Sequence, residues 1–342
     1  MTTLSSTRSA RPTMVDVARE AQVSLKTVSR VVNREPGVRP ETSERVRAVM
    51  ERLGFQRNDS ARQLRRGKTA SIGLVVEDLA NPFYSSLAAA IEQEAREASH
   101  LLISGSTEGS VEREASLVDA LLDRRVDGLV VVPATGSVPE TAERRTWGTP
   151  LVYVDRPVEG ASADTVLSDN DGGIRSAVEH LAGHGHRGLG YLGDAPDLWT
   201  ARRREAAFRT ACADLALPVP PRVAMGPHTA GSLVPVLKEW GRGAEPATAL
   251  VTGNNRVTVA LLHALQASGL RFSFVGYDDF ELADVLVPPV TVVHQDPPEL
   301  GRRAARRLFG RLGGDASPPH TERVPTRLIV RESGAMAASG RS

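Results

Sequence analysis

The sequence predicts an α/β protein with an N-terminal three-helix helix-turn-helix domain and a two-lobed body of parallel sheets. Residues 13–33 contain two short helical patterns separated by a tight turn. Residues 1–68 carry 15 Lys and Arg against 7 Asp and Glu, a net charge of +8, whereas residues 69–342 carry 27 against 34, or −7. From Ser71 onward, short β-rich runs alternate with helical ones, which is typical of a parallel sheet covered on both faces.

The first two helical patterns form the predicted helix pair. Thr13 and Ser24 are of the residue types that cap helix N-termini. The apolar positions expected in the first pattern are Val15, Val17, Ala18 and Ala21, and those in the second are Val28, Val31 and Val32. Between them lies a face of hydrogen-bond donors formed by Lys26, Thr27, Ser29, Arg30 and Asn33. Such a face suits base edges and phosphates in a major groove. The alternative is an ordinary helical hairpin with solvated charges, and the basic N-terminal segment favours a DNA-binding element over it.

A third helical pattern completes this domain, and a short basic linker follows it. Val46, Val49, Met50 and Leu53 recur at helical spacing, and Gly54 ends the pattern. We expect a DNA-binding domain over residues 12–57. Residues 58–68 contain too few apolar side chains for a core, so they are expected to form a linker.

The body contains too many strands for one small sheet. The expected strands are Ser71–Val76, Leu101–Ser104, Gly128–Val132, Leu151–Val154, Thr165–Ser168, Gly188–Leu192, Ala249–Thr252, Phe272–Gly276 and Val290–Val293. We expect two lobes in residues 69–333, the first from about 69–168 and 297–321 and the second from about 169–296 and 322–333. The chain from Glu332 onward is expected to be frayed, with a tail over 334–342. Ligands of such folds bind beyond the carboxyl ends of the strands.

Composition narrows the function classes. No apolar run approaches the roughly 20 residues that cross a bilayer, and the first twelve residues lack an apolar signal region, so we expect a cytoplasmic protein without a membrane partner. The single cysteine, Cys212, excludes an internal disulfide and any multi-cysteine zinc site. His184 and His186 have no further ligands nearby, and the G-x-G-x-x-G pattern at 188–193 lies inside a strand run. We therefore expect neither a metal nor a cofactor.

Ordered motifs along the chain resemble those of the lactose/galactose-repressor family of bacterial transcription factors. The resemblance covers about residues 12–333 and has this motif order: Val15-Asp16-Val17-Ala18, Thr27-Val28-Ser29-Arg30-Val31-Val32-Asn33, Asn58 with Ala61-Arg62 and Leu64, Asn81-Pro82-Phe83, Asp155-Arg156-Pro157, Val178-Glu179-His180-Leu181, Val275-Gly276-Tyr277-Asp278 and Gln295-Asp296. It implies a periplasmic-binding-protein-like body and a homodimer bound to double-stranded operator DNA.

The resemblance also implies roles for individual DNA-binding residues. The linker 58–68, with Asn58, would form a hinge helix in the minor groove, where Leu64 would intercalate and bend the duplex. Leu25 and Lys26 occupy the positions that select the operator. Phosphate contacts are implied for Thr27, Ser29 and Asn33, and a base or phosphate contact for Arg30.

A cleft between the lobes would bind a small-molecule effector. The residues that match the family's effector positions, or lie beside them, are Asp78, Phe83, Tyr84, Asp155, Arg156, Thr200, Arg204, His228, Asn254 and Asp278. Carboxylates, an amide and an arginine suit the vicinal hydroxyls of a saccharide, and an aromatic ring covers its apolar face. Alternatively, Asp278 caps the following helix, Arg204 is a solvated member of Arg202-Arg203-Arg204, and Phe83 packs in the core.

These observations predict a homodimeric, effector-controlled transcriptional regulator that acts as a repressor. The competing class is an enzyme on the same α/β body, for which no nucleophile stands out. A non-regulatory sugar-binding protein of a transport system would need export and would not carry the +8 segment. The sequence ends without a leucine heptad repeat, so we expect a dimer and not a coiled-coil tetramer.

Overall fold

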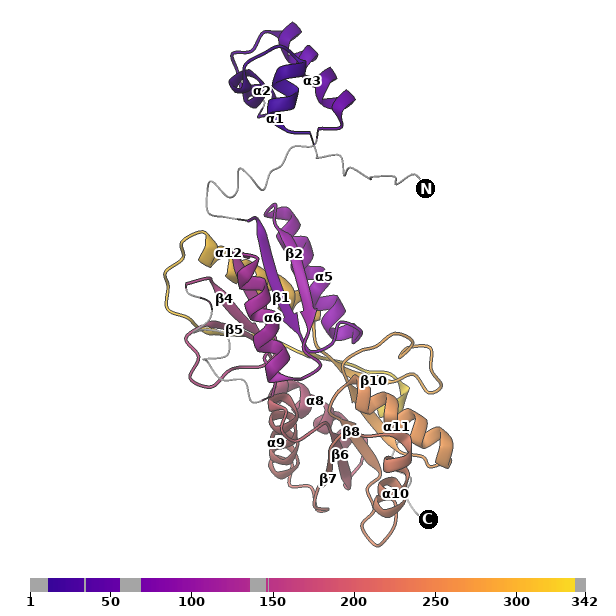
Figure 1. Ribbon diagram of the computed structural model, residues 1–342. Coiled ribbons are helices and arrows are strands. Elements are labelled where there is room, and N and C mark those ends of the chain that lie inside the picture. Colours follow the sequence, from indigo (N-terminus) through magenta and orange to yellow (C-terminus); the bar gives the residue numbers. More distant parts are fainter. Residues whose placement is uncertain (1–11, 34, 56–68, 136–145, 147, 336–342) are drawn as a thin grey trace, which may run out of the picture. The chain divides into compact units, whose positions relative to one another are not determined.

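The computed structural model describes residues 12–33, 35–55, 69–135, 146 and 148–335 (Figure 1). It divides into two compact units, Met1–Thr69 and Ala70–Ser342. The expected linker, with Asn58 and Leu64, lies outside the described residues.

The N-terminal unit contains the three expected helices, α1 (Met14–Glu20), α2 (Leu25–Val32) and α3 (Pro40–Leu53). Thr13 caps α1 in a capping box with Asp16, and the Ser24 side chain accepts from the backbone N–H of Thr27 at the start of α2. One fully buried valine from each helix meets in the core: Val17, Val28 and Val46.

Two details define the limits of this small core. Val15 is 52% exposed because it precedes Val17 by two residues, which places it about 200° around the helix from the buried face. Gly54 ends α3 with a φ of 65°, a left-handed conformation that favours glycine.

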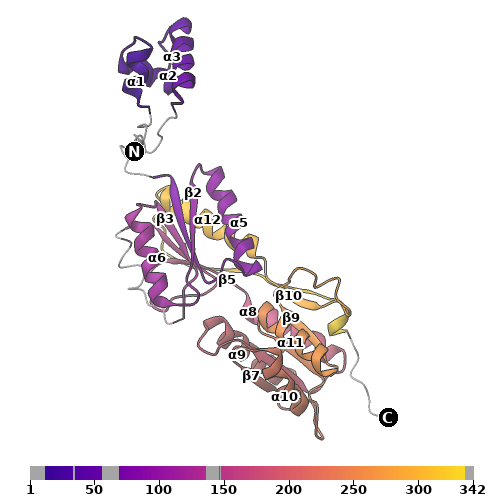
Figure 2. The ribbon, with the colours of Figure 1, turned by 45° about the vertical axis from the view of Figure 1, so that its right-hand side comes forward.

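The first lobe of the body is built on a parallel sheet with strand order β11-β5-β4-β3-β1-β2. Its strands are β1 (Ser71–Val76), β2 (Leu101–Ser106), β3 (Gly128–Val131), β4 (Leu151–Val154), β5 (Asp164–Ser168) and β11 (Thr321–Val324). Helices α5 (Pro82–Glu97) and α12 (Pro297–Leu312) cover one face, and α6 (Val111–Asp123) covers the other (Figure 2). Alternate β1 residues therefore enter different cores: Leu74 faces α5 and α12, whereas Val75 faces α6.

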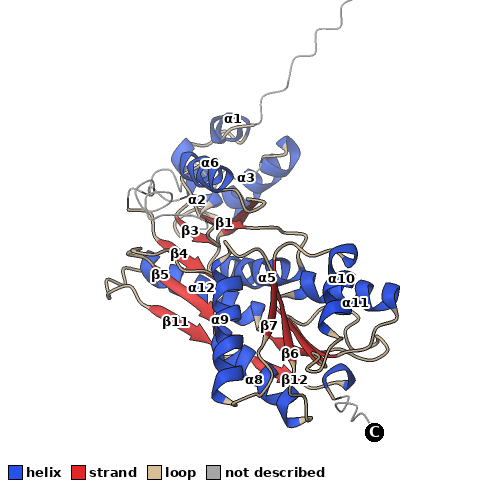
Figure 3. Cartoon of the chain, turned by 90° about the horizontal axis from the view of Figure 1, so that it is seen from below, coloured by secondary structure: helices blue, strands red, loops and turns tan. Residues whose placement is uncertain are grey.

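The second lobe repeats this plan with strand order β12-β10-β9-β8-β6-β7. Its strands are β6 (Leu189–Gly193), β7 (Arg222–Met225), β8 (Ala249–Thr252), β9 (Ser273–Tyr277), β10 (Thr291–His294) and β12 (Arg327–Ile329), of which only β12 is antiparallel to its neighbour. Figure 3 shows the helices on the two sides of β6 and β7: α8 (Asn170–Gly183) and α9 (Trp199–Asp214) on one side, and α10 (Ala230–Trp240) and α11 (Asn255–Ser268) on the other.

The nine expected strands are present with shifts of one or two residues, but three further strands were missed. These are β7, β11 and β12, which all lie at sheet edges. These three edge strands are buried less completely, and their sequences do not form the apolar runs that reveal central strands.

The chain passes between the lobes three times. The first two passages lie after Ser168 and before Pro297. The third falls at residues 325–326 instead of 321–322, because β11 pairs with β5 in the first sheet. As a result, segments of the two lobes alternate along the chain, and the last of them, β12 with η1, belongs to the second lobe.

The expectation of a frayed chain from Glu332 onward is wrong for the first residues of that stretch. A 3₁₀ turn, η1 (Glu332–Gly334), packs against the second sheet. Ser333 is fully buried, donates to the carbonyl of Phe274 and accepts from the backbone N–H of Thr291. The structure describes the chain to residue 335.

Two compositional expectations can be compared with the structure. Cys212 packs in the core of the second lobe, and its burial raises the pKa of the thiol to about 11. In the described part of the chain, no helix combines the length and apolar character needed to cross a bilayer.

Candidate functional site

The outward side of α2 carries the residues expected to read DNA. Leu25 is 50% exposed and Lys26 is also exposed, whereas Thr27, Ser29 and Arg30 are half-buried. The Thr27 hydroxyl lies 2.9 Å from the Ser24 hydroxyl. The structure thus leaves Leu25 and Lys26 as the most accessible of the expected residues on this helix.

The half-buried Asn33 directly follows α2. Its side chain donates to the Ser29 hydroxyl over 3.4 Å. Two of the expected phosphate-contacting residues, Ser29 and Asn33, are therefore tied to each other at the C-terminal end of α2.

The body has a second polar site where strand ends from both lobes meet. Glu77 follows β1, and Asp155 with Arg156 follows β4 in the first lobe. In the second lobe, Asp194 follows β6 and Asp278 follows β9. Because parallel strands place their carboxyl ends at one edge of a sheet, residues far apart in sequence line one cavity.

Helices supply the rest of the cavity wall. The first turn of α5 contributes Phe83 and Tyr84, whose rings are in edge contact with centroids 5.0 Å apart. Helix α9 contributes Thr200 and Arg204. The remaining lining residues are Asn81, Leu198, Asn254, Asn255, Arg256 and Gln295.

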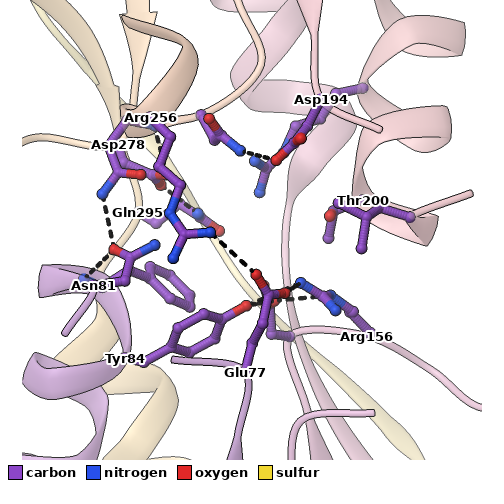
Figure 4. Close-up of a pocket in the computed structure, with 15 residues that line it drawn as sticks. Glu77, Asn81, Tyr84, Arg156, Asp194, Thr200, Arg256, Asp278 and Gln295 are labelled. Atoms are coloured by element: carbon purple, nitrogen blue, oxygen red, sulfur yellow. Dashed lines mark hydrogen bonds and ion pairs between the residues drawn. The ribbon is translucent and has the colours of Figure 1, made fainter. Parts of the chain in front are cut away.

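Arg156 is the centre of charge in the first-lobe half of the cavity (Figure 4). It is 6% exposed, forms an ion pair with Glu77, and donates to the Tyr84 hydroxyl over 3.0 Å. Burial alone would lower the pKa of Arg156, but Tyr84, Glu77 and Asp155 outweigh it and raise the pKa. Burial raises the pKa of Asp155, and Arg156 opposes that shift.

Arg204 has the equivalent place in the second-lobe half. It is 4% exposed, while Arg202 and Arg203 are exposed, so the solvated alternative does not apply to it. Its guanidinium donates to the Asn170 side chain over 2.6 Å and to the Gly253 carbonyl over 2.7 Å. It also lies 3.9 Å from the centre of the Tyr277 ring, a cation–π arrangement.

Two aspartates of the cavity have a sparsely populated backbone conformation. Asp155 has a φ of 70° and Asp278 a φ of 67°, both in the left-handed region. Each directly follows a central strand, β4 or β9, and each lies in a different lobe. Such strain persists where the surrounding structure enforces it, which is common at ligand sites. Asp278 accepts from the Gln295 side chain over 2.5 Å and from the backbone N–H of Asn255, at the start of α11, over 3.4 Å, whereas Asp296 caps α12, the helix that follows Asp278 in the chain.

The cavity is nearly filled by its own side chains. Its free volume is about 40 Å³, enough for roughly three water molecules, whereas pockets for small ligands are usually several hundred Å³. Three lining atoms have no hydrogen-bond partner in the described part of the protein: Arg156 Nε, Asn255 Oδ1 and Gln295 Oε1. A bound molecule with hydroxyl groups could satisfy both acceptors and the donor.

Eight of the ten expected effector residues line this cavity, and their role in binding stays a prediction. Asp78 does not line it but forms an ion pair with Arg256, which does. His228 also does not line it, and its ring lies 3.3 Å from the Ala224 carbonyl. Phe83 both lines the cavity and packs in the first-lobe core, so a role in effector contact and a role in core packing are compatible.

The sequence reasoning missed several lining residues. Glu77, Asp194 and Gln295 each directly follow a strand, so the strand-end rule could have found them. Asn255 and Arg256 begin α11, and nothing in their local sequence indicates a cavity. Within the described residues, no group of three or more potential ligands is arranged to hold a metal ion.

Comparison with known proteins gives one family match in the N-terminal unit and another in the body. Residues 13–58 match the description "Bacterial regulatory proteins, lacI family", and residues 178–334 match "Periplasmic binding protein-like domain". The HTH-type transcriptional regulator CelR of Thermobifida fusca is 31% identical over 339 residues, covering 96% of this chain and 99% of that protein. The chain belongs to the LacI family of bacterial regulatory proteins.

Solved structures agree with this assignment. A Lac repressor dimer bound to operator and the anti-inducer ONPF matches with a TM-score of 0.84 and 27% identity, over 96% of this chain and all of that one. A complex of CelR with cellobiose matches with a TM-score of 0.68 and 29% identity, over 94% and 100% of the two chains. This LacI-family protein is therefore a DNA-binding transcriptional regulator with a periplasmic-binding-protein-like body.

Replacing Arg156, the buried arginine of the first lobe, should destabilise this LacI-family protein to an extent that depends on pH. Arg156→Met would leave Asp155 without its nearest cation and Glu77 with Arg256 alone, so we expect a loss of about 3–5 kcal/mol of unfolding free energy near pH 7.5. Without Arg156 the pKa of Asp155 rises further above its unfolded value, so the folded state takes up a proton as pH falls, and the loss should be smaller at pH 5.

Urea unfolding followed by tryptophan fluorescence measures the free energy of unfolding of the body, because all three tryptophans belong to it. The control is Arg303→Met, which removes half-exposed ion pairs with Glu299 and Glu322 and should cost about 1 kcal/mol or less. An equal loss in both variants, or a pH-independent loss at position 156, would contradict the assigned charge balance.

Proposed function

We propose that this chain represses transcription by binding a pseudo-palindromic operator as a homodimer, and that a neutral saccharide in the interlobe cleft controls its operator affinity. The observation that carries the proposal is the presence, in one chain, of an exposed helix-turn-helix surface and a polar cavity built from both lobes. Because its partner is DNA, the proposal places the protein in the bacterial cytoplasm. It assigns no catalytic step, since the relatives named above are regulators.

The DNA-binding half of the proposal rests on α2. Its buried valines fix the helix against the domain core, which leaves Leu25 and Lys26 to enter a major groove. Lys26 could donate to guanine O6 or N7, and Leu25 could contact a thymine methyl group. We assign the phosphate contacts to Thr27, Ser29 and Asn33, and operator bending to Leu64 in the linker.

The charge balance of the cavity supports a neutral effector. Its arginines already have partners: Arg156 binds Glu77, Arg204 binds Asn170, and Arg256 binds Asp78. Four carboxylates line the cavity and a fifth, Asp78, borders it, so no surplus positive charge is available for a phosphate or carboxylate. Hydroxyl groups, by contrast, suit the carboxylates and the unpartnered amide oxygens. The complex of the relative CelR with cellobiose supports a saccharide.

Control of operator affinity follows if the saccharide prefers one arrangement of the lobes. Asn170 begins α8 immediately after the first passage between lobes, accepts from Arg204, and donates to the Ser168 carbonyl over 3.1 Å. A ligand that forms hydrogen bonds with Arg204 therefore acts close to a chain segment that connects the two lobes and affects their relative orientation. Effector and operator affinities would then be coupled reciprocally. We expect the saccharide to be an inducer.

Exposed apolar side chains support a homodimer. Leu282, Val285 and Val287, in the connection between β9 and β10, are 60%, 64% and 97% exposed. Isolated exposed valines are ordinary, but three apolar side chains within six residues indicate a contact surface. We propose that a second copy of this chain covers them.

Fluorescence anisotropy tests the main proposal. The labelled DNA is the sequence upstream of the chain's own gene, at fixed salt with nonspecific competitor, and the sugar panel includes cellobiose. Specific binding released by one sugar supports induction, and tightening would make that sugar a corepressor. Insensitivity to the whole panel would remove the saccharide, and absence of specific binding would count against this operator.

Lys26→Ala should weaken specific DNA binding about tenfold, because it removes a base-reading donor. Lys238→Ala is the matched control: it removes the same charge from an exposed position on α10. Both are measured by anisotropy at one salt concentration. Equal weakening by the two variants would show a nonspecific charge effect and contradict the role of Lys26.

Asp278→Asn should weaken the sugar response roughly tenfold or more while leaving unliganded DNA binding nearly intact, because it removes a charged hydrogen-bond acceptor from the cavity. Asp123→Asn makes the same change at an exposed position at the end of α6 and should have no effect. Titration of the responsive sugar against the DNA complex measures the shift. A parallel loss of DNA binding in Asp278→Asn would indicate damage to the fold.

Val285→Asp should convert the dimer to monomer, since a charge would have to be buried in the contact. Val330→Asp places the same charge at a similarly exposed valine, 58% against 64%, outside the proposed contact. Sedimentation velocity at micromolar concentration distinguishes the two states. A dimeric Val285→Asp variant would place the contact elsewhere, and a monomeric parent protein would refute the homodimer.

A further inference from the structure

The two lobes touch through a second set of polar contacts beside the cavity. Arg256 donates to Asp78 over 2.5 Å and lies 3.5 Å from Glu77. Next to this ion pair, Asn255 donates to the Asn81 side chain over 2.8 Å. Glu77, Asp78 and Asn81 belong to the first lobe, and Asn255 and Arg256 to the second. We call these five residues the latch.

The latch joins two helix N-termini. Asn81 caps α5, and Asn255 and Arg256 are the first two residues of α11. Both helix ends carry partial positive charge, so bringing them together with Arg256 would be unfavourable without anions nearby. Glu77 and Asp78 supply those anions. The contact therefore depends on charge complementarity across the lobes and not on apolar packing.

Because the cavity is nearly filled, the latch affects how an effector can enter it. A free volume of about 40 Å³ does not admit a saccharide, so the lobes must part or the lining side chains must move before one binds. Figure 4 shows Arg256 extending across the cavity toward Glu77. Parting of the lobes would therefore break the interlobe ion pair of Arg256 with Asp78.

We propose that the latch holds the unliganded lobes closed and sets the free energy of effector access. This inference rests on the proposed function, because it concerns regulation of the same cleft. A closed unliganded state reduces apparent effector affinity by the fraction of molecules that are open. The latch also makes lobe closure salt-sensitive, since the Arg256 and Asp78 side chains are 51% and 34% exposed.

Single-molecule FRET within one full-length chain tests the latch without DNA or sugar. Dyes are attached to cysteines at Asp123, at the end of α6 in the first lobe, and Gln266, near the end of α11 in the second, with Cys212→Ala removing the native thiol. Labelled chains are mixed with excess unlabelled chain, so that each distance lies within one molecule. The ratio of open to closed lobes is the measured quantity.

Arg256→Gln should raise this ratio about fivefold, the size expected for a part-exposed ion pair. Arg203→Gln is the matched control, because Arg203 pairs with Asp171 at similar exposure but wholly within the second lobe. Raising NaCl to about 1 M should open the parent and the control alike, and should have little further effect on Arg256→Gln. The exchanged pair Asp78→Arg with Arg256→Asp should restore closure.

An unchanged ratio in Arg256→Gln, or an equal change in Arg203→Gln, would overturn the latch. The latch would also be overturned if the exchanged pair gave the same ratio of open to closed lobes as Arg256→Gln alone. The FRET readout needs neither operator nor effector. The FRET results can therefore support the latch even where the anisotropy experiments contradict the proposed function, and the two failures are distinguishable.

Discussion

The cavity depends on one constraint: in both lobes, the central strands run in the same direction. Parallel pairing brings the residues after β1 and β4 to one edge of the first sheet, and those after β6, β9 and β10 to one edge of the second. The two edges face each other, so carboxylates and amides from distant parts of the chain form one polar surface. The antiparallel strand β12 lies at the outer edge of its sheet and does not disturb this arrangement.

Buried charge is tolerated at this surface because each lobe carries its own cation. Arg156 neutralises its neighbours in the first lobe, and Arg204 is held by an amide, a carbonyl and the Tyr277 ring in the second. Each half thus contains buried charges of both signs. The ion pair between the lobes joins the partly exposed Arg256 and Asp78, so its interaction is weaker and can be exchanged for that of a ligand.

Much of this architecture could be predicted because its physical causes are local. Capping residues and buried valines define the helix pair, and strands buried on both faces form uninterrupted apolar runs. The edge strands lack that pattern. In the cavity, the strand-end rule and the family resemblance located residues such as Asp155 and Asp278. The pairing of Arg256 with Asp78 joins residues 178 positions apart, and no local pattern encodes it.

The return of the chain to the first lobe after residue 296 has a consequence for synthesis on the ribosome. Leu300, Ala304 and Leu308 of α12 belong to the core of the first lobe, and β11 completes its sheet. These segments emerge only after residues 169–296 have been made. The second lobe can begin to collapse while the first still lacks one of its two covering helices on that face, so the nascent chain exposes an apolar sheet surface for the time needed to translate about 130 residues.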